Sequence, residues 1–241
     1  MKATVNYPIT WGSKNFSISY NLIESHINHA PMKATSKGKI WEKKLYNLYS
    51  EILNKQENQF KSVIDVGAYI GTHTLPMAFF TNMGKVFAFE PSQQINDTLR
   101  KNVEESGLNN ICVSNELISH QVDELEFYDR SDGTSRISNR LINCDSHSKK
   151  ITKPLDMCIP DEYKNNIALI KIDVEGHELN VLKGAKKVIE QSRPIILIEV
   201  FNHKLKQIKE WCDNNDYDIK SLRGEDYQLT PISHSTNSQL D

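Results

Sequence analysis

The sequence contains no CxxC pair, no long apolar run and no excess of either charge. The longest apolar runs, such as residues 194–198, are far shorter than a membrane span, and the N-terminus lacks the apolar segment of a signal peptide. We therefore expect a cytoplasmic protein without a transmembrane helix. The cysteines are scattered, so they suggest neither a zinc site nor a disulfide framework. They are Cys112, Cys144, Cys158 and Cys212.

Acidic and basic residues nearly balance, with 31 Asp and Glu against 29 Lys and Arg. This balance argues against a protein built to bind nucleic acid, which would carry a basic face. The apolar share of 38% and the charged share of 25% are those of a globular protein. A chain of 241 residues can bury a full core, and its length favours one domain with an appendage. The oligomeric state cannot be read from the sequence.

We expect three regions along the chain. Residues 1–60 form an N-terminal extension, weakly patterned at first and then carrying an amphipathic helix from Ser36 to about Lys55. This extension would bind a substrate or act as a lid. Residues 61–231 form the main domain, and the polar tail 232–241 is expected to be disordered.

The most informative stretch is residues 169–185, LIKIDVEGHELNVLKGA. Apolar residues run into Asp173 and Glu175, a glycine breaks the run, and an amphipathic helical pattern follows. In open α/β sheets, ligands bind beyond the carboxyl ends of the strands, where these two carboxylates would lie. Alone, however, the pattern is more typical of a strand whose last Asp caps a helix. It indicates a site only if other strands direct charge to the same edge.

Two further predicted strands meet that condition. Residues 63–66 form a buried strand with Asp65 near its end, and the turn between Gly67 and Gly71 leads into a helix. The next strand, residues 86–89, ends at Glu90, 25 residues after Asp65. An acid at that tip can accept hydrogen bonds from both hydroxyls of an adenosine ribose. The spacing therefore indicates a cofactor that contains a nucleoside.

The glycine turn separates two classes of cofactor. A turn that binds NAD would read G-x-G-x-x-G, but positions 69 and 70 are Tyr and Ile. Tyr69 would stand where the backbone must approach a pyrophosphate, so the turn better suits a cofactor without diphosphate, such as S-adenosylmethionine. Asp65 would then face the ammonium of its amino acid part, and the backbone N–H groups of residues 72–74 would face the carboxylate.

The rest of the pattern completes a doubly wound α/β sheet. Residues 123–140 form a polar, turn-rich segment, in which Asp132-Gly133 is a hairpin signal between residues 125–128 and later residues. This segment lies where it would close over the ligand edge. It is followed by a linker that contains lysines and by a short helix that begins at Leu155. We expect further strands near residues 111–118, 167–173, 194–200, 217–222 and 227–231, and further helices near residues 93–106, 179–189 and 205–212.

Four segments in this order and spacing resemble the FkbM family of S-adenosylmethionine-dependent methyltransferases. They are DVGAYIGTHT, FAFEPS, IKIDVEGHELNVLKGA and PIILIEV. The resemblance covers about residues 61–231 and is most specific from IDVEGHE to LKGA. It implies the class I methyltransferase fold, a Rossmann-like doubly wound sheet, mostly parallel with an antiparallel strand near the C-terminus. It also implies O-methylation, commonly of a sugar or polyketide hydroxyl.

The resemblance carries cofactor contacts over to Asp65, Gly67, Gly71 and Glu90. Tyr69 departs from the family pattern, which usually has Asn at this position. The departure bears on how this turn would contact the methionine part of the cofactor and leaves the expected fold unchanged. The other candidate cofactor-binding residues are Ala68, Tyr69, Thr72, His73, Thr74, Pro91, Ser92, Asn115 and Glu116.

Methyl transfer to oxygen is an in-line displacement, so an enzyme must align the acceptor and help to remove its proton. Alignment can supply on the order of 7–11 kcal/mol, and a positioned base about 10²–10⁴ in rate. The candidate catalytic residues at the ends of the fourth and fifth strands are Asp173, Glu175, His177 and Glu199. His177 has the most suitable intrinsic pKa for a base, and His73 is a second possible base.

Three alternatives stay open at this point. Asp173 and Glu199, with Asn202 or His203, would form an oxygen-rich metal site, but two carboxylates are too few to predict a metal. The second alternative is that the acceptor is a polyketide or an amine instead of a carbohydrate or related small molecule. A non-catalytic module that only binds S-adenosylmethionine is disfavoured, because three carboxylates would have no need to converge on such a pocket.

Overall fold

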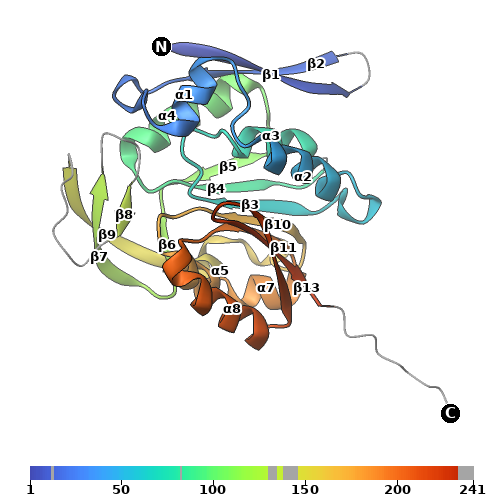
Figure 1. Ribbon diagram of the computed structural model, residues 1–241, viewed down its shortest axis with the longest axis vertical. Coiled ribbons are helices and arrows are strands. Elements are labelled where there is room, and N and C mark those ends of the chain that lie inside the picture. Colours follow the sequence, from blue (N-terminus) through green and yellow to red (C-terminus); the bar gives the residue numbers. More distant parts are fainter. Residues whose placement is uncertain (12–13, 82, 130–134, 138–145, 233–241) are drawn as a thin grey trace.

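The computed structural model describes residues 1–11, 14–81, 83–129, 135–137 and 146–232. Its centre is a seven-stranded sheet in the order β12-β13-β11-β10-β3-β4-β5 (Figure 1). The five strands from β11 to β5 are parallel, whereas β13 runs antiparallel to both of its neighbours. The strands are β3 (Ser62–Val66), β4 (Val86–Phe89), β5 (Ile111–Ser114), β10 (Ile167–Ile172), β11 (Ile195–Glu199), β12 (Tyr217–Arg223) and β13 (Asp226–Pro231). The predicted doubly wound α/β sheet, mostly parallel with an antiparallel strand near the C-terminus, is confirmed.

Helices cover both faces of this sheet, as Figure 1 shows. The central strands β3, β4 and β10 are buried along their whole length, because helices exclude water from both sides. One face packs against α2 (Lys43–Leu53), α3 (Thr74–Phe80) and α4 (Gln93–Ser106). The other face packs against α5 (Leu155–Cys158), α6 (Glu178–Gly184), α7 (Lys186–Ser192) and α8 (Leu205–Asn214). None of the helices within the described residues is long and apolar enough to cross a membrane.

The N-terminal region is more structured than its sequence pattern indicates. It begins with a hairpin of β1 (Lys2–Trp11) and β2 (Lys14–Asn21), and α1 (Ala30–Ser36) follows. The prediction of one helix from Ser36 to Lys55 is wrong, because Gly38 and Glu42 adopt positive φ angles of 65° and 47° and the helix begins only at Lys43. Tyr49 and Leu45 of α2 are then buried against the sheet.

A second sheet, of four strands, stands beside the main one (Figure 1). It contains β6 (Leu117–Ser119), β7 (Asp123–Asp129), β8 (Arg136–Ile137) and β9 (Ser146–Pro154). The prediction of one strand over residues 111–118 is wrong, because β5 ends at Ser114 and the chain then leaves the main sheet to pair β6 with β9. The predicted lysine-containing linker is also wrong, since most of it is β9.

The helical pattern after β10 forms two helices instead of one. They meet at Ala185, where Gly184 packs so closely that a Cβ would lie 1.9 Å from the backbone oxygen of Ser119. Short 3₁₀ turns complete the fold at Glu24–His26, Gln56–Asn58, Asp161–Tyr163 and Asn202–Lys204. β7 pairs antiparallel with β8, which confirms the predicted hairpin between residues 125–128 and later residues. Residues 132–133, Cys144 and all but the first residue of the predicted tail lie outside the described residues.

Candidate active site

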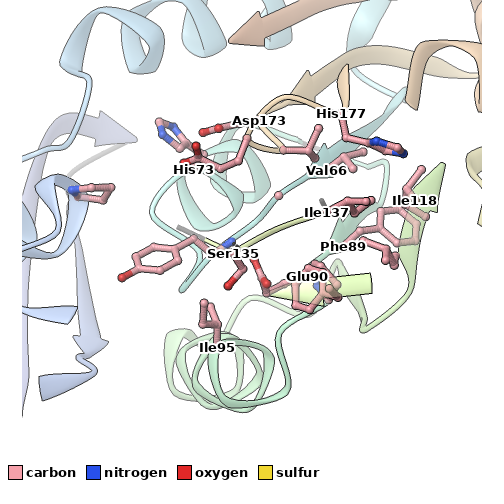
Figure 2. A pocket seen from close by; sticks show the side chains of 18 of the residues that line it. Val66, His73, Phe89, Glu90, Ile95, Ile118, Ser135, Ile137, Asp173 and His177 are labelled. Carbon is pink, nitrogen blue, oxygen red and sulfur yellow. Dashed lines mark hydrogen bonds between the residues drawn. The ribbon is translucent and has the colours of Figure 1, made fainter. Parts of the chain in front are cut away.

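A pocket opens beyond the carboxyl ends of β3, β4 and β10, where open α/β sheets bind ligands (Figure 2). It comprises about 840 Å³ of space, including its opening to solvent. The N-terminal region contributes His29 and Trp41 to its wall, and the four-stranded sheet contributes Phe127 and Ile137. Three separate parts of the chain therefore meet around one pocket.

The glycine turn is held close to β10. Gly67 has a φ of 88°, and a Cβ on it would lie 1.7 Å from the backbone oxygen of Asp173. The amide of Asp173 in turn donates to the carbonyl of Val66 at 2.9 Å. Only glycine permits this approach, because it combines a positive φ with the absence of a side chain. The turn thereby fixes Asp173 beside the predicted cofactor site.

Glu90 lies at the tip of β4, as predicted, and lines the pocket. Its Oε2 accepts a hydrogen bond from the amide of Tyr69 at 3.0 Å, and its Oε1 accepts one from the amide of Ser92 at 2.9 Å. Burial raises the pKa of Glu90 to about 7, although these two bonds lower it. A carboxylate can accept about four hydrogen bonds, so two positions remain for hydroxyl donors such as those of a ribose.

Asp65 does not line the pocket. It is fully buried beneath the wall, where Thr74 Oγ1 donates to its Oδ2 at 2.6 Å. Its Oδ1 is buried and has no hydrogen-bond partner among the residues that the structure describes. The predicted contact of Asp65 with an ammonium group therefore stays a prediction, and from this position Asp65 would act by its charge.

The other candidate cofactor residues divide into two groups. Those that line the pocket are Gly67, Tyr69, Thr72, His73, Glu90, Pro91 and Glu116. Those outside the lining are Asp65, Ala68, Gly71, Thr74, Ser92 and Asn115. In the second group, Thr74 donates to Asp65 and the amide of Ser92 donates to Glu90, so both hold residues of the predicted cofactor site in place. Asn115, in contrast, is exposed. The structure thus brings the two halves of the predicted cofactor site together.

Asp173 and Glu199 form a pair at the ends of adjacent strands. Asp173 lines the pocket, whereas Glu199 lies behind it and shares a side-chain hydrogen bond with it. Lys171 Nζ lies 3.0 Å from Asp173 Oδ2. Although burial raises it, the ammonium of Lys171 holds the pKa of Asp173 below its ordinary value. The charge of Asp173 and burial raise the pKa of Glu199 to about 9, so the pair carries one proton at neutral pH.

His177 lines another side of the pocket (Figure 2). Its Nε2 lies 2.9 Å from Ser119 Oγ, and the side-chain Nδ2 of Asn180 donates to its Nδ1 at 3.1 Å. This pattern places the ring proton on Nε2, so neither nitrogen offers an unused lone pair. Burial and the charge of Lys204 lower the pKa of His177 to about 4, which keeps the ring neutral. These contacts do not test the predicted role of His177 as base.

His73 is held by two residues of the N-terminal region. Its Nδ1 bonds to the hydroxyl of Tyr49 at 2.8 Å, and its Nε2 lies 3.2 Å from Glu42 Oε2. Although burial raises it, the bond to His73 keeps the pKa of Glu42 below its ordinary value. Since both ring nitrogens are engaged, His73 is a fixed part of the wall that carries the glycine turn.

Sequence reasoning missed Lys171, Glu42 and Tyr49. Lys171 is only 3% exposed, and its signal was visible as a single Lys inside an otherwise apolar strand. Glu42 and Tyr49 gave no such signal, because their pattern is that of any amphipathic helix.

Glu175 also lines the pocket and has a positive φ of 53°. Asn202 and His203, named for a possible metal site, lie in the 3₁₀ turn after β11. Within the described part of the chain, no group of three or more His, Cys, Asp or Glu residues could hold a metal ion.

Comparisons with known proteins agree with this geometry. The methyltransferase FkbM domain matches residues 65–224. Hexuronic acid methyltransferase AglP of Haloferax volcanii is 30% identical over 147 residues, which cover 56% of this chain and 54% of that protein. The chain therefore spans about half the length of this curated relative.

Two solved structures share the fold. A methyltransferase FkbM from Methylobacillus flagellatus has a TM-score of 0.52 and 19% identity, and the match covers 78% of this chain and 50% of that chain. A putative rRNA methylase from Clostridium thermocellum has a TM-score of 0.50 and 11% identity, and covers 78% of this chain and 92% of that chain. The glycine turn, Glu90 and Asp173 lie at one sheet edge, and the FkbM domain matches residues 65–224, more than half of this chain, so the chain belongs to the FkbM family of S-adenosylmethionine-dependent methyltransferases.

Proposed function

We propose that this chain transfers a methyl group from S-adenosylmethionine to a hydroxyl of a sugar, glycan or related small molecule. The observation that carries the proposal is the position of Asp173. Its carboxylate lies in the pocket, next to the glycine turn and held by Lys171. Trp41 and Phe127 supply aromatic surface to the same pocket. Carboxylates that accept from hydroxyls, combined with flat apolar surface, suit a carbohydrate acceptor. The similarity to a hexuronic acid methyltransferase supports the same class.

The bound cofactor supplies a methyl group on a positively charged sulfur. Glu90 has acceptor positions for ribose hydroxyls, and the negative charges of Asp65 and Asp173 favour a cationic cofactor over its neutral product. Asp173 accepts a hydrogen bond from the acceptor hydroxyl, which aims the oxygen and takes up its proton. Lys171 keeps that carboxylate ionised at neutral pH. His177 stays neutral and shapes another side of the pocket.

Two other functions give different results in the same assay. An amine or polyketide acceptor would take the label in place of every sugar. A module that only binds S-adenosylmethionine would retain the cofactor and transfer no label to any acceptor. We also propose a cytoplasmic location, because the three cysteines in the described part of the chain are unpaired, which suits a reducing compartment.

The test is incubation with isotopically labelled S-adenosylmethionine and a panel of sugars, glycans, amines and polyketides, followed by mass spectrometry of the products. Asp173→Asn should lower the rate of transfer by about 10²-fold or more while cofactor affinity changes little. Asp161→Asn is the matched control, since the Asp161 side chain is 94% exposed and is not part of the pocket lining. Label on no sugar, or an unchanged rate in Asp173→Asn, would contradict the proposal.

A further inference from the structure

Three carboxylates lie in one row across the carboxyl edge of the main sheet. β10 pairs with β11 so that Ile172 lies opposite Ile198, which puts the next residues, Asp173 and Glu199, level with each other. β11 pairs with β13 so that Glu199 lies opposite Asp226. Because side chains alternate along a strand, all three point to the face that α2 covers.

The strand register puts neighbouring members of the row side by side. Asp173 and Glu199 share a side-chain hydrogen bond. Glu199 and Asp226 line the same small cleft, together with Lys171 and Leu45. Residues directly opposite each other in an antiparallel pair have Cβ atoms about 4.5–5.5 Å apart, a span that two carboxyl groups bridge directly or through one water. The register and the shared cleft therefore place the three carboxylates in sequence from β10 to β13.

The two ends of the row face different spaces. Asp173 lines the active-site pocket, and Asp226 does not. Asp226 lines a second cleft, between α2 and the turn that joins β12 to β13. Lys44, Asn47 and Arg223 around that cleft are exposed. The row thus connects the pocket, where the acceptor would be enclosed, with a separate surface cleft.

The protonation states along the row are graded. Glu199 has a pKa of about 9 and is protonated at neutral pH, whereas the pKa of Asp173 lies below its ordinary value. Burial raises the pKa of Asp226 to about 6, so it can accept a proton and lose it again near neutral pH. The charged and titratable groups that face the row are Lys171 on β10, Asp65 on β3, Glu42 and Tyr49 at α2, and His73 at the start of α3.

We propose that Asp173, Glu199 and Asp226 form the route by which the acceptor's proton leaves the pocket. The inference rests on the proposed function, because methylation of a hydroxyl releases one proton. As the new O–CH₃ bond forms, the sulfur keeps the electron pair of the bond that breaks, and the hydroxyl proton passes to Asp173. Glu199 gives its proton to Asp226, which releases it to solvent water. Asp173 then passes its proton to Glu199, and the row returns to its starting state. Asp173 touches the acceptor, whereas Glu199 and Asp226 act through it.

The first test compares Asp226→Asn with Glu225→Gln. Glu225 is the neighbouring acid, but its carboxylate accepts from the amide of Asn202 and stands outside the row. With the sugar that the labelled panel identifies, Asp226→Asn should lower kcat about tenfold and raise the solvent deuterium isotope effect on kcat, with KM little changed. Asp226→Glu should restore both values, and Glu225→Gln should resemble the unaltered protein. An unchanged kcat and isotope effect in Asp226→Asn would overturn the route.

A second test needs no acceptor. Infrared spectra at about pH 8 should show a protonated carboxyl group that disappears in Glu199→Gln and persists in Glu225→Gln. If Glu199→Gln removes no such signal, the row holds no proton to pass on and the route is wrong. Absence of label transfer in both the unaltered protein and Glu225→Gln would instead contradict the proposed function, so the two failures are distinguishable.

Discussion

Replacing Lys171 by Met removes the cation at the centre of the buried carboxylates. Lys171 is 3% exposed, its Nζ lies 3.0 Å from Asp173 Oδ2, and the fully buried Asp65 lies opposite it on β3. Met has nearly the same length and an apolar stem, so the substitution leaves little cavity. The expected loss of folding stability is therefore electrostatic in origin.

The expected cost is about 3–5 kcal/mol of unfolding free energy, because removal of one partner leaves buried charge uncompensated. The side chain of Asp173 is 30% exposed, which moves the expectation to about 3 kcal/mol, the lower end of that range. Lys186→Met is the matched control. Its ammonium is 72% exposed and 3.8 Å from Glu190, so its loss should cost less than about 1 kcal/mol.

The dependence on pH gives the sharper test. In the unaltered protein the folded pKa of Asp173 lies below 3.8, so its contribution to stability is present above that pH and is lost as the pH falls through the folded pKa. In Lys171→Met, unopposed burial raises that pKa, and the ionised carboxylate destabilises the folded state above the raised value. The deficit should therefore be largest at neutral pH and shrink in acid.

Urea unfolding, followed by tryptophan fluorescence at about pH 7.5 and about pH 5, measures this deficit. A deficit at neutral pH no larger than that of Lys186→Met, or a deficit that grows at the lower pH, would refute the reasoning.

Three further substitutions test the cofactor turn and the pocket. Gly67→Ala should lower the unfolding free energy by about 2 kcal/mol or more in thermal unfolding, because its Cβ would meet the backbone oxygen of Asp173 at a positive φ. Since the pKa of Glu90 is about 7 and bound hydroxyls favour its ionised form, the affinity for S-adenosylmethionine in calorimetry should rise with pH through about 7 and level off above it. Glu90→Gln should bind more weakly, with no such rise. His177→Asn should lower kcat but leave the shape of the pH profile between about pH 6 and 8 unchanged, because the pKa of His177 is about 4.

Much of the main sheet follows from local sequence signals. Each of its central strands is a short apolar run that a helix pattern follows, and this alternation defines a doubly wound sheet whatever the exact ends of the elements. Of the four-stranded sheet, only the hairpin of β7 and β8 was predicted. The rest was missed because β9 contains Lys149, Lys150 and Lys153 and resembles a solvated linker. β9 pairs with β6 and β7, which lie well before it in the sequence, and a short stretch of sequence carries no signal for such pairing.

The candidate site was predictable where a residue ends a strand. Glu90 and Asp173 could be placed at the ligand edge because the carboxyl ends of parallel strands meet there. Asp226 could not, because its position opposite Glu199 depends on an antiparallel strand inserted from the end of the chain. The contact between Glu42 and His73 depends in the same way on where the N-terminal region docks.

That docking is what encloses the row of carboxylates. Glu42 holds a positive φ of 47°, a conformation that costs on the order of 1–3 kcal/mol for a residue with a side chain and persists only where surrounding contacts enforce it. Here the contact is with His73, whose other nitrogen bonds to Tyr49. Trp41, the residue before Glu42, lines the pocket. The segment that contributes Trp41 to the pocket wall is therefore the same one that fixes His73 in the glycine turn and covers the row of carboxylates. This one segment lines the pocket, holds His73 and covers the row of carboxylates. A substitution in it that reshapes the pocket must therefore also keep the row of carboxylates buried.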